Sequence, residues 1–327
     1  MLLTRRKPVL IRAGHFSDGN FVNRLRQAIT AAAAARRMTS ARVGEAGGAF
    51  AGMGDFQVPE GVFGSTLVHW ADDPAYAPSG AEIDAEIAED RRKCSVSGDL
   101  PAEIHRATVE NSLKLRKWIE AEKLDAFTVN FLGCGPGIGL SCVPFLECSK
   151  AMARRIGYAG EGDVLTALFC GALLSFNPDT TFSEMFCPDW KGTRIFLSHM
   201  GEMNLNLMAQ KPFLSFRKWT FGNGGDIAVA TGCLRGGEAM LANLAPGPDG
   251  SFTLIAAPVR MTAQDDPALP QMRGWMTPPG NMPVPEFLEA YSRVGGTHHL
   301  VLSYGCDAGM LEDIAALMGW KYHAVNG

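Results

Sequence analysis

Two glutamates in short, distinctive segments are the first residues whose surroundings suggest chemistry. Glu161 lies in the glycine-flanked segment YAGEGDV, directly before a long apolar stretch. If that stretch is a helix, its positive N-terminal end keeps a nearby carboxylate ionised and able to bind a metal. Asp163, in the same segment, is read more simply as a helix cap. Glu184 lies between two phenylalanines in TTFSEMF, where an acid must be paired, metal-bound or shifted in pKa.

Histidines at the ends of apolar runs complete the candidate site. His199 ends the run IFLSHMGE, and His298 and His299 open the run THHLVLSY. Because side chains alternate along a strand, we expect only one of this pair to face inward. Carboxylates and imidazoles without a thiolate suit Mn²⁺, Co²⁺ or Mg²⁺ better than structural zinc. The predicted metal site consists of Glu161, Glu184, His199 and either His298 or His299, one of several Glu and His sets that a chain of this length offers.

His15 is a further candidate because it ends the predicted strand 8–15. Open α/β sheets bind their ligands at the carboxyl ends of strands, so we predict a substrate-facing position for this histidine. The remaining histidines lie in ordinary loop, helix or terminal-strand contexts, where a structural role is the default. They are His69, His105 and His323.

The elements that must position these residues change in character along the chain. The first half alternates apolar runs with helical periodicity, which predicts an α/β domain with a parallel, Rossmann-like sheet. Strands are predicted at 8–15, 41–47 and 125–131, and helices at 20–37, within 81–124, at 144–156 and at 164–176. The last of these helices is apolar nearly all round, as a buried helix should be.

Short β-type runs separated by Gly, Pro and Asp clusters follow residue 180. They are typical of a mostly antiparallel, barrel-like sheet, with one helix at 310–320 before a final strand. We therefore predict an α/β domain over 1–180 and a mostly-β domain over 181–327.

Composition excludes several classes of function. The 327 residues are 46% hydrophobic and 20% charged, with a net charge of −4, which gives no electrostatic footprint for nucleic acid or an anionic membrane. No apolar stretch reaches the roughly 20 residues that a membrane span needs. The eight cysteines are scattered, so packed, reduced thiols are expected, although Cys134 and Cys142 lie in a glycine-rich loop and could be reactive. We expect a cytoplasmic protein.

The glycine-rich loop FLGCGPGIGL at 131–140 superficially suggests a dinucleotide fingerprint. Pro136 interrupts it, the glycine spacing is wrong, and no acidic residue ends a next strand at the required distance. An NAD(P)-dependent oxidoreductase is therefore a minor alternative.

Several segments together resemble the L-arabinose isomerase family and, more broadly, the arabinose/fucose sugar isomerases. The family's order is followed by DAFTVNF, GYAGEGDVLTAL, TTFSEMF, LSHMGE and GGTHHLVLS. The resemblance starts at KPVLIRAGHF, extends to KYHAVN, and so covers essentially the whole chain. Val164 stands where the family commonly has tryptophan, and the residues after His199 differ from arabinose-specific versions, so the sugar need not be arabinose.

The resemblance implies a site and a reaction. Glu161, Glu184, His199 and His299 match the family's metal ligands, and the two glutamates also match its acid/base pair. Phe131, Phe182 and Met200 match residues that line the sugar pocket. The implied reaction interconverts an aldose and a ketose through a cis-enediol, with a divalent metal, most simply Mn²⁺, polarising O1 and O2.

The resemblance also implies a homo-oligomer that acts on a small sugar. The sequence opens at what resembles the family's central domain, without its N-terminal domain. The alternative is thus a catalytically silent metal-binding module that needs a separate N-terminal partner.

Overall fold

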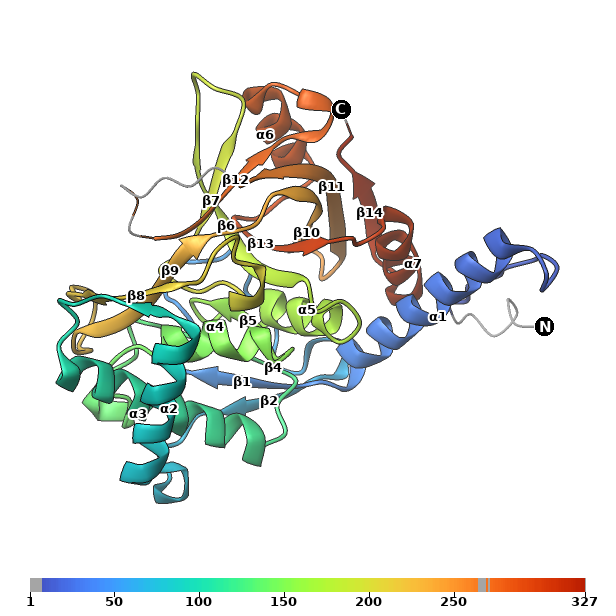
Figure 1. Cartoon of the computed structure of the whole chain (residues 1–327). Coiled ribbons are helices and arrows are strands. Elements are labelled where there is room, and N and C mark those ends of the chain that lie inside the picture. The colour runs from blue at the N-terminus through green and yellow to red at the C-terminus, as the bar shows by residue number, and fades with distance from the viewer. Residues whose placement is uncertain (1–7, 264–268, 270, 327) are drawn as a thin grey trace.

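The computed structural model of the chain describes residues 8–263, 269 and 271–326 (Figure 1). It contains a four-stranded parallel sheet and a larger, mostly antiparallel sheet, which confirms the predicted fold class. Within the described ranges, no helix is both long and apolar enough to cross a membrane.

The parallel sheet is formed by the first half of the chain. Its strands, in spatial order, are β2 (Thr66–His69), β1 (Arg42–Ala46), β4 (Ala126–Val129) and β5 (Gly157–Gly160). Every residue of β4 and β5 is buried, as expected for parallel strands covered on both faces. The helices of this half are α1 (Gly19–Ser40), α2 (Gly80–Lys93), α3 (Ala102–Ala121), α4 (Phe145–Ala153) and α5 (Val164–Leu174).

The second sheet closes into a barrel. The six strands of the ring are β11 (Phe252–Thr262), β10 (Gly237–Pro246), β13 (His299–Tyr304), β6 (Thr180–Pro188), β7 (Ile195–Ser198) and β12 (Met272–Thr277). Each pairs with its neighbours in antiparallel fashion, and the pairing of β12 with β11 completes the ring. Closure leaves no free edge within these six strands.

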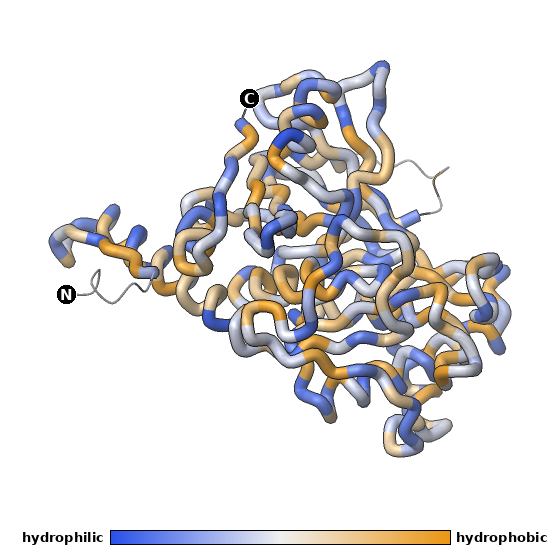
Figure 2. The backbone as a smooth tube through the Cα atoms, turned by 180° about the vertical axis from the view of Figure 1, so that it is seen from behind, coloured by the Kyte–Doolittle hydropathy of each residue, from blue (hydrophilic) through white to orange (hydrophobic). Residues whose placement is uncertain are grey.

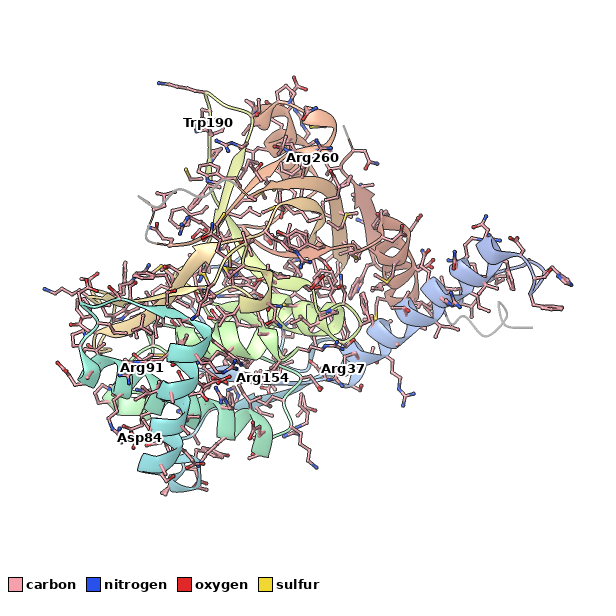
Figure 3. The ribbon with its side chains drawn as sticks, viewed as in Figure 1. Arg37, Asp84, Arg91, Arg154, Trp190 and Arg260 are labelled. Carbon is pink, nitrogen blue, oxygen red and sulfur yellow. The ribbon has the colours of Figure 1, made fainter. Side chains whose placement is uncertain are left out.

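Shorter elements surround the barrel. Strands β9 (Ile227–Cys233), β8 (Phe213–Arg217) and β3 (Ser95–Val96) extend the sheet beyond β12, and β14 (Lys321–Ala324) pairs with β11. The helices of this half are α6 (Val284–Arg293) and α7 (Ala308–Met318). Trp190 lies on the loop that projects between β6 and β7 and is 65% exposed (Figure 3).

Helix α5 connects the two sheets through a common core. Ten of its eleven residues are buried, as its uniformly apolar sequence predicts. It packs against β5 and β4 on one side and against β6 and β13 on the other. One hydrophobic cluster accordingly contains Phe127 of the parallel sheet, Leu168 of α5 and Val301 of the barrel. The domain boundary near residue 180 coincides with the start of β6, and the division into two domains stays a prediction.

The predicted strand at 8–15 is wrong. These residues form no strand and instead run back along α1, whose first half projects from the body (Figure 1). Arg12 pairs with Asp313 of α7, and Arg24 donates a hydrogen bond to the Ala13 carbonyl at 3.2 Å. The segment therefore packs on helices, and β1 is the first strand of the parallel sheet. Strand β1 pairs in parallel with β2 and with β4, and β4 pairs in parallel with β5.

Candidate metal centre

Three side chains converge where the parallel sheet meets the barrel. Glu161 directly follows β5, His298 precedes β13, and His299 is the first residue of β13. Oε2 of Glu161 lies 3.6 Å from Nε2 of His298 and 3.5 Å from Nε2 of His299. Each residue offers one ligand atom, and these three atoms lie within 4.8 Å of one another. Glu161 has a left-handed backbone (φ 61°), a conformation that costs energy outside glycine and is concentrated at functional sites.

The three converging atoms have no hydrogen-bond partner. Oε2 of Glu161 and Nε2 of both His298 and His299 are buried and unpaired. Buried polar atoms in native proteins are nearly always satisfied, so three unsatisfied ones facing one point indicate a missing ligand. One carboxylate and two imidazoles form a donor set that fits a divalent transition-metal ion.

Glu184 and His199 adjoin this group. Glu184 lies on β6, where it pairs with His299 of β13 on one side and with Ser198 of β7 on the other. His199 follows Ser198, and its ring centroid lies 5.4 Å from that of His299. The ring of Phe182 contacts both imidazoles, each at a centroid distance of 5.0 Å. Strand pairing thus places Glu184, His199 and His299 at one end of the barrel, and Glu161 reaches His299 from the end of β5. Of the four predicted ligands, only Glu161 and His299 belong to the tight group of three.

The expectation that only one of the paired histidines approaches the site is wrong. His298 lies in a bend before β13, so the alternation of side chains along a strand does not apply to it. Both imidazoles therefore reach Glu161.

A carboxylate contacts the Nδ1 atom of each histidine. Asp163 Oδ2 lies 2.9 Å from Nδ1 of His299, and Glu202 Oε2 lies 3.0 Å from Nδ1 of His199. Asp55 Oδ2 lies 2.6 Å from Nδ1 of His298. Asp163 also caps α5, because its Oδ1 accepts a hydrogen bond from the Thr166 N–H at 2.8 Å. Asp163 thus has a second contact besides the predicted cap.

Most of the chain is similar in sequence to known proteins. Residues 179–321 match the L-arabinose isomerase C-terminal domain family. The L-arabinose isomerase of Leuconostoc mesenteroides is 30% identical over 275 residues, which cover 80% of this chain and 57% of that enzyme. The enzyme of Pediococcus pentosaceus is 29% identical over 277 residues, with the same two coverages. This chain is related to the L-arabinose isomerases. It spans a little over half the length of these two relatives.

These relatives confirm the resemblance to the arabinose isomerases. A third relative comes from Shouchella clausii. Its L-arabinose isomerase is 34% identical over 191 residues, which cover 55% of this chain and 38% of that enzyme. The wider likeness to fucose isomerases stays a prediction.

In this chain, the pKa values of the two glutamates of the site shift in opposite directions. Burial raises the pKa of Glu184 above its usual value. Burial also opposes ionisation of Glu161, but the neighbouring His298, His199 and His299 together hold its pKa below the usual value. Burial lowers the pKa of His299 strongly, aided by the other two imidazoles, which favours the neutral form that binds metals.

The residues predicted to line the sugar pocket have different placements. Phe182 is fully buried beneath the two imidazoles, and Met200 directly follows His199. Phe131 follows β4 and forms an aromatic group with Phe50, Trp219, Phe221 and Phe145.

The structure does not bring His15 to the metal centre. It lies in the exposed turn before α1, where its Nδ1 is 2.7 Å from the Ser17 hydroxyl. Its predicted position depended on a strand at 8–15. Because that strand does not form, His15 does not lie at the carboxyl end of a strand of the sheet.

The glycine-rich loop lacks the context of a dinucleotide site. After β4 it turns back on itself through a bridge between Gly135 and Leu140, and α4 begins only at Phe145. The glycines of a dinucleotide fingerprint lead directly into a helix, whereas this loop ends before α4 begins. Cys134 and Cys142 are buried, and burial raises their pKa values to about 12 and 11. Such thiols are packed rather than reactive.

We expect Mn²⁺ to stabilise the chain after treatment with EDTA. Binding to the folded form alone adds roughly 2.7 kcal/mol at a free metal concentration of 100 times Kd. A thermal unfolding scan with and without Mn²⁺ measures this as a rise in Tm that grows with the logarithm of the metal concentration. Ca²⁺, which prefers six to eight oxygen ligands, is the control and should shift Tm much less. Equal shifts with both ions would contradict a selective centre.

Proposed function

We propose that the chain is a divalent-metal-dependent aldose–ketose isomerase. The observation that carries the proposal is the convergence of three buried, unpaired ligand atoms from Glu161, His298 and His299. The relatives named L-arabinose isomerase support a sugar as the substrate. Mn²⁺ is the proposed metal, with Co²⁺ or Mg²⁺ as alternatives.

Glu161 and Glu184 are the proposed acid/base pair. Moving the carbonyl from C1 to C2 requires that a proton leave C2 and return at C1, while a hydroxyl proton moves between the oxygens. One glutamate carries the carbon-bound proton through the enediol, and the other moves the hydroxyl proton. A bound divalent ion supplies a Lewis acid that stabilises the negative charge developing on the sugar oxygens. Glu161, Glu184, His199 and His299 are its proposed ligands, joined by His298 because of its contact with Glu161.

The buried surroundings of this pair favour the proposed reaction. Phe182 lies against both His199 and His299, so one side of the centre is apolar and water is excluded there. Electrostatic stabilisation is stronger in such a low-dielectric site than in water. Phe131 and Met200 are the further proposed contacts of the sugar.

A silent metal-binding module is the second candidate function. It would share the metal centre with the isomerase, and the residues aligned with two of the relatives cover 57% of those enzymes. A panel of pentoses, hexoses and deoxysugars incubated with the chain and Mn²⁺ separates the two, because the isomerase must yield a ketose from at least one aldose. Mn²⁺ binding without any ketose would favour the silent module.

Homo-oligomer formation and a cytoplasmic location are part of the proposal. Apolar side chains on and beside the projecting half of α1 support self-association: Phe16 is 80% exposed, Ile29 61% and Leu25 40%. Figure 2 shows apolar segments along this projecting part. Exposed apolar groups of this kind mark interaction surfaces.

We expect the double change Leu25→Glu with Ile29→Glu to shift the chain to a smaller species. Two charges buried at an apolar contact cost several kcal/mol, enough to weaken association more than a hundredfold. Light scattering during size-exclusion chromatography measures the molar mass. Asn23→Glu, on the same helix and exposed, is the matched control and should leave the mass unchanged. An unchanged mass in the double variant would remove α1 from the interface.

A further inference from the structure

Three carboxylates from separate parts of the chain repeat one arrangement around the metal centre. Asp55 comes from the loop after β1, Asp163 from the start of α5, and Glu202 from the turn after β7. Each contacts Nδ1 of a different histidine, at distances of 2.6, 2.9 and 3.0 Å respectively. The same contact made three times from unrelated elements points to a common purpose.

We propose that Asp55, Asp163 and Glu202 are positioning residues that fix the proton of each imidazole on Nδ1 and direct Nε2 toward the metal. The inference rests on the proposed function, since it assumes that a metal binds there. It concerns residues outside the proposed ligand set. Asp163 follows the ligand Glu161 by two positions, and Glu202 follows the ligand His199 by three.

The chemistry of a neutral imidazole carries the argument. One ring nitrogen is a donor and the other an acceptor, and only the acceptor can bind a metal. A carboxylate accepts hydrogen bonds, so it selects the form with the proton on Nδ1 and leaves the Nε2 lone pair free. In this chain, Nε2 of His298 and of His299 both face Oε2 of Glu161. Such outer partners also hold the ring in place and make the ligand more basic.

Burial strengthens two of these contacts. The side chains of Asp163, Glu202 and His299 are fully buried, and that of His199 is nearly so. Glu202 also accepts a hydrogen bond from the Tyr158 hydroxyl at 2.8 Å. A buried carboxylate without partners would be strongly unfavourable, so these partners keep each one in a single orientation.

The loop 47–56 brings the third carboxylate to the site. Gly47 and Gly48 have positive φ angles of 84° and 75°, and a Cβ on Gly162 would lie 2.8 Å from the Gly48 carbonyl oxygen. Glycine is therefore required where the loop passes over the segment that carries Glu161. At its end, the ring of Phe56 stacks on His299 with a centroid distance of 4.9 Å and an interplanar angle of 6°. The loop thus holds both adjacent imidazoles, one by Asp55 and one by Phe56.

Asp55→Ala and Asp163→Asn are the variants that test the proposal. Among the described residues, the Asp55 carboxylate accepts hydrogen bonds only from the backbone N–H and the ring Nδ1 of His298, so its removal disturbs little else. Asparagine caps a helix about as well as aspartate, so Asp163→Asn retains the start of α5 while weakening the selection of the His299 proton position. Glu60→Ala, an exposed acid close to the loop, is the matched control.

Isothermal titration of EDTA-treated protein with Mn²⁺ measures the effect. We expect Mn²⁺ affinity to fall 10–100-fold in both variants, the range seen when such outer partners are removed, and to stay unchanged in Glu60→Ala. The Tm measured in EDTA should stay close to that of the natural sequence in all three. A purely structural role predicts the reverse, a lower Tm in EDTA with unchanged Mn²⁺ affinity.

The two proposals fail in distinguishable ways. Mn²⁺ affinity within twofold of the natural sequence in both variants overturns the positioning role and leaves the isomerase proposal intact. Weakened binding in the variants of a chain that converts no aldose supports the positioning role and overturns the isomerase. No Mn²⁺ binding by the natural sequence overturns both.

Discussion

Replacing Glu161 by glutamine is expected to lower aldose–ketose turnover by about a thousandfold or more. Glutamine has nearly the same size and can keep the local packing, but it can neither take up a proton nor supply a charged ligand. Positioned acid/base groups contribute roughly 10²–10⁴-fold to such reactions, and loss of one metal ligand adds to the deficit. Ketose formation with Mn²⁺ present measures the change, using the aldose of the panel that reacts fastest.

The same loss is expected for Glu184→Gln, because the enediol needs both proton-transfer groups. Glu289→Gln is the control: this glutamate is exposed on α6 and forms an ion pair with Arg293 at 3.5 Å, so its loss should alter neither turnover nor stability measurably. Unchanged Tm values in EDTA would show that all three variants fold. Turnover above a tenth of the original in Glu161→Gln would exclude this residue from the acid/base pair.

The sequence predicted the neighbourhood of the site better than its contacts. Glu184 and His199 come together because β6 and β7 pair, and the apolar run that ends at His199 indicates the second of these strands. Strict alternation allowed only one of His298 and His299 to face the site, and this rule fails where a strand begins with a bend. Asp55 could not be found at all, since 243 residues separate it from the histidine that it contacts. Glu202 follows His199 by three positions, and this spacing is the one signal that could have indicated it.

The fold was predicted well where burial is extreme. A helix that is apolar all round, such as α5, can only be buried, and the runs that form β10, β11 and β13 are equally unambiguous. The segment 8–15 contains an apolar run only at 9–11; Arg12 pairs with Asp313, and the chain packs on α1 instead of joining a sheet. Strand β8 contains half-exposed residues such as Phe213 and Phe216, so its sequence has no clear periodicity that would indicate a strand. Closure of the barrel depends on the pairing of β11 with β12, which no local pattern encodes.

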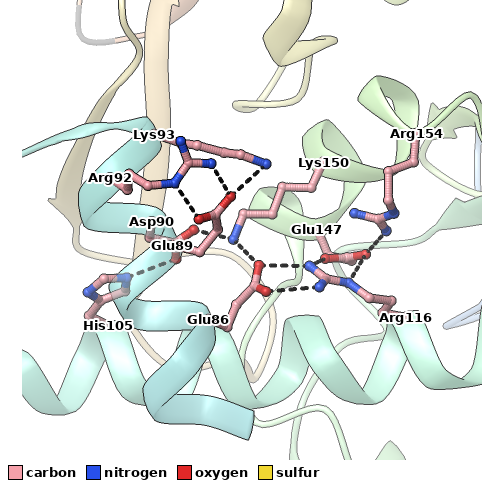
Figure 4. Close-up of polar contacts among 10 residues, drawn as sticks. All are labelled: Glu86, Glu89, Asp90, Arg92, Lys93, His105, Arg116, Glu147, Lys150 and Arg154. Atoms are coloured by element: carbon pink, nitrogen blue, oxygen red, sulfur yellow. Dashed lines mark hydrogen bonds and ion pairs between the residues drawn. The ribbon is translucent and has the colours of Figure 1, made fainter.

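An ion-pair network among α2, α3 and α4 gives the largest expected effect on stability (Figure 4). Nζ of Lys150 lies 2.7 Å from Glu86 Oε1 and also pairs with Asp90, whose side chain is only 1% exposed. Within the described part of the chain, the other ionic partner of Asp90 is His105, at 3.0 Å. Arg116 joins Glu86 to the fully buried Glu147 at 2.8 Å on each side. The network thus holds three helices together through charges that water hardly reaches.

Acid should weaken this network. Burial alone would raise the pKa of Glu86, but Arg116 and Lys150 hold it at about 2, below the usual 4.5. Because the folded-state pKa is the lower one, this contribution to stability is complete above the unfolded value of about 4.3 and is lost as the pH falls toward 2.

Lys150→Met is expected to destabilise the chain by about 3 kcal/mol at pH 7. Methionine preserves the length and apolar packing of the side chain but takes the lysine charge away from Asp90, which keeps its contact with His105. Breaking a buried pair costs roughly 3–5 kcal/mol. A fall in Tm of about 4 °C follows for a chain of 327 residues, because unfolding gains roughly 2.1 cal/mol/K of entropy per residue. Lys93→Met is the control, because Lys93 is 63% exposed and pairs with Glu89 at 3.0 Å, a surface contact that contributes at most about 1 kcal/mol. Adding Asp90→Asn to Lys150→Met should restore part of the loss, since it removes the charge left without its lysine. Equal Tm values for the two lysine variants would mean that the network contributes no more than an ordinary surface pair.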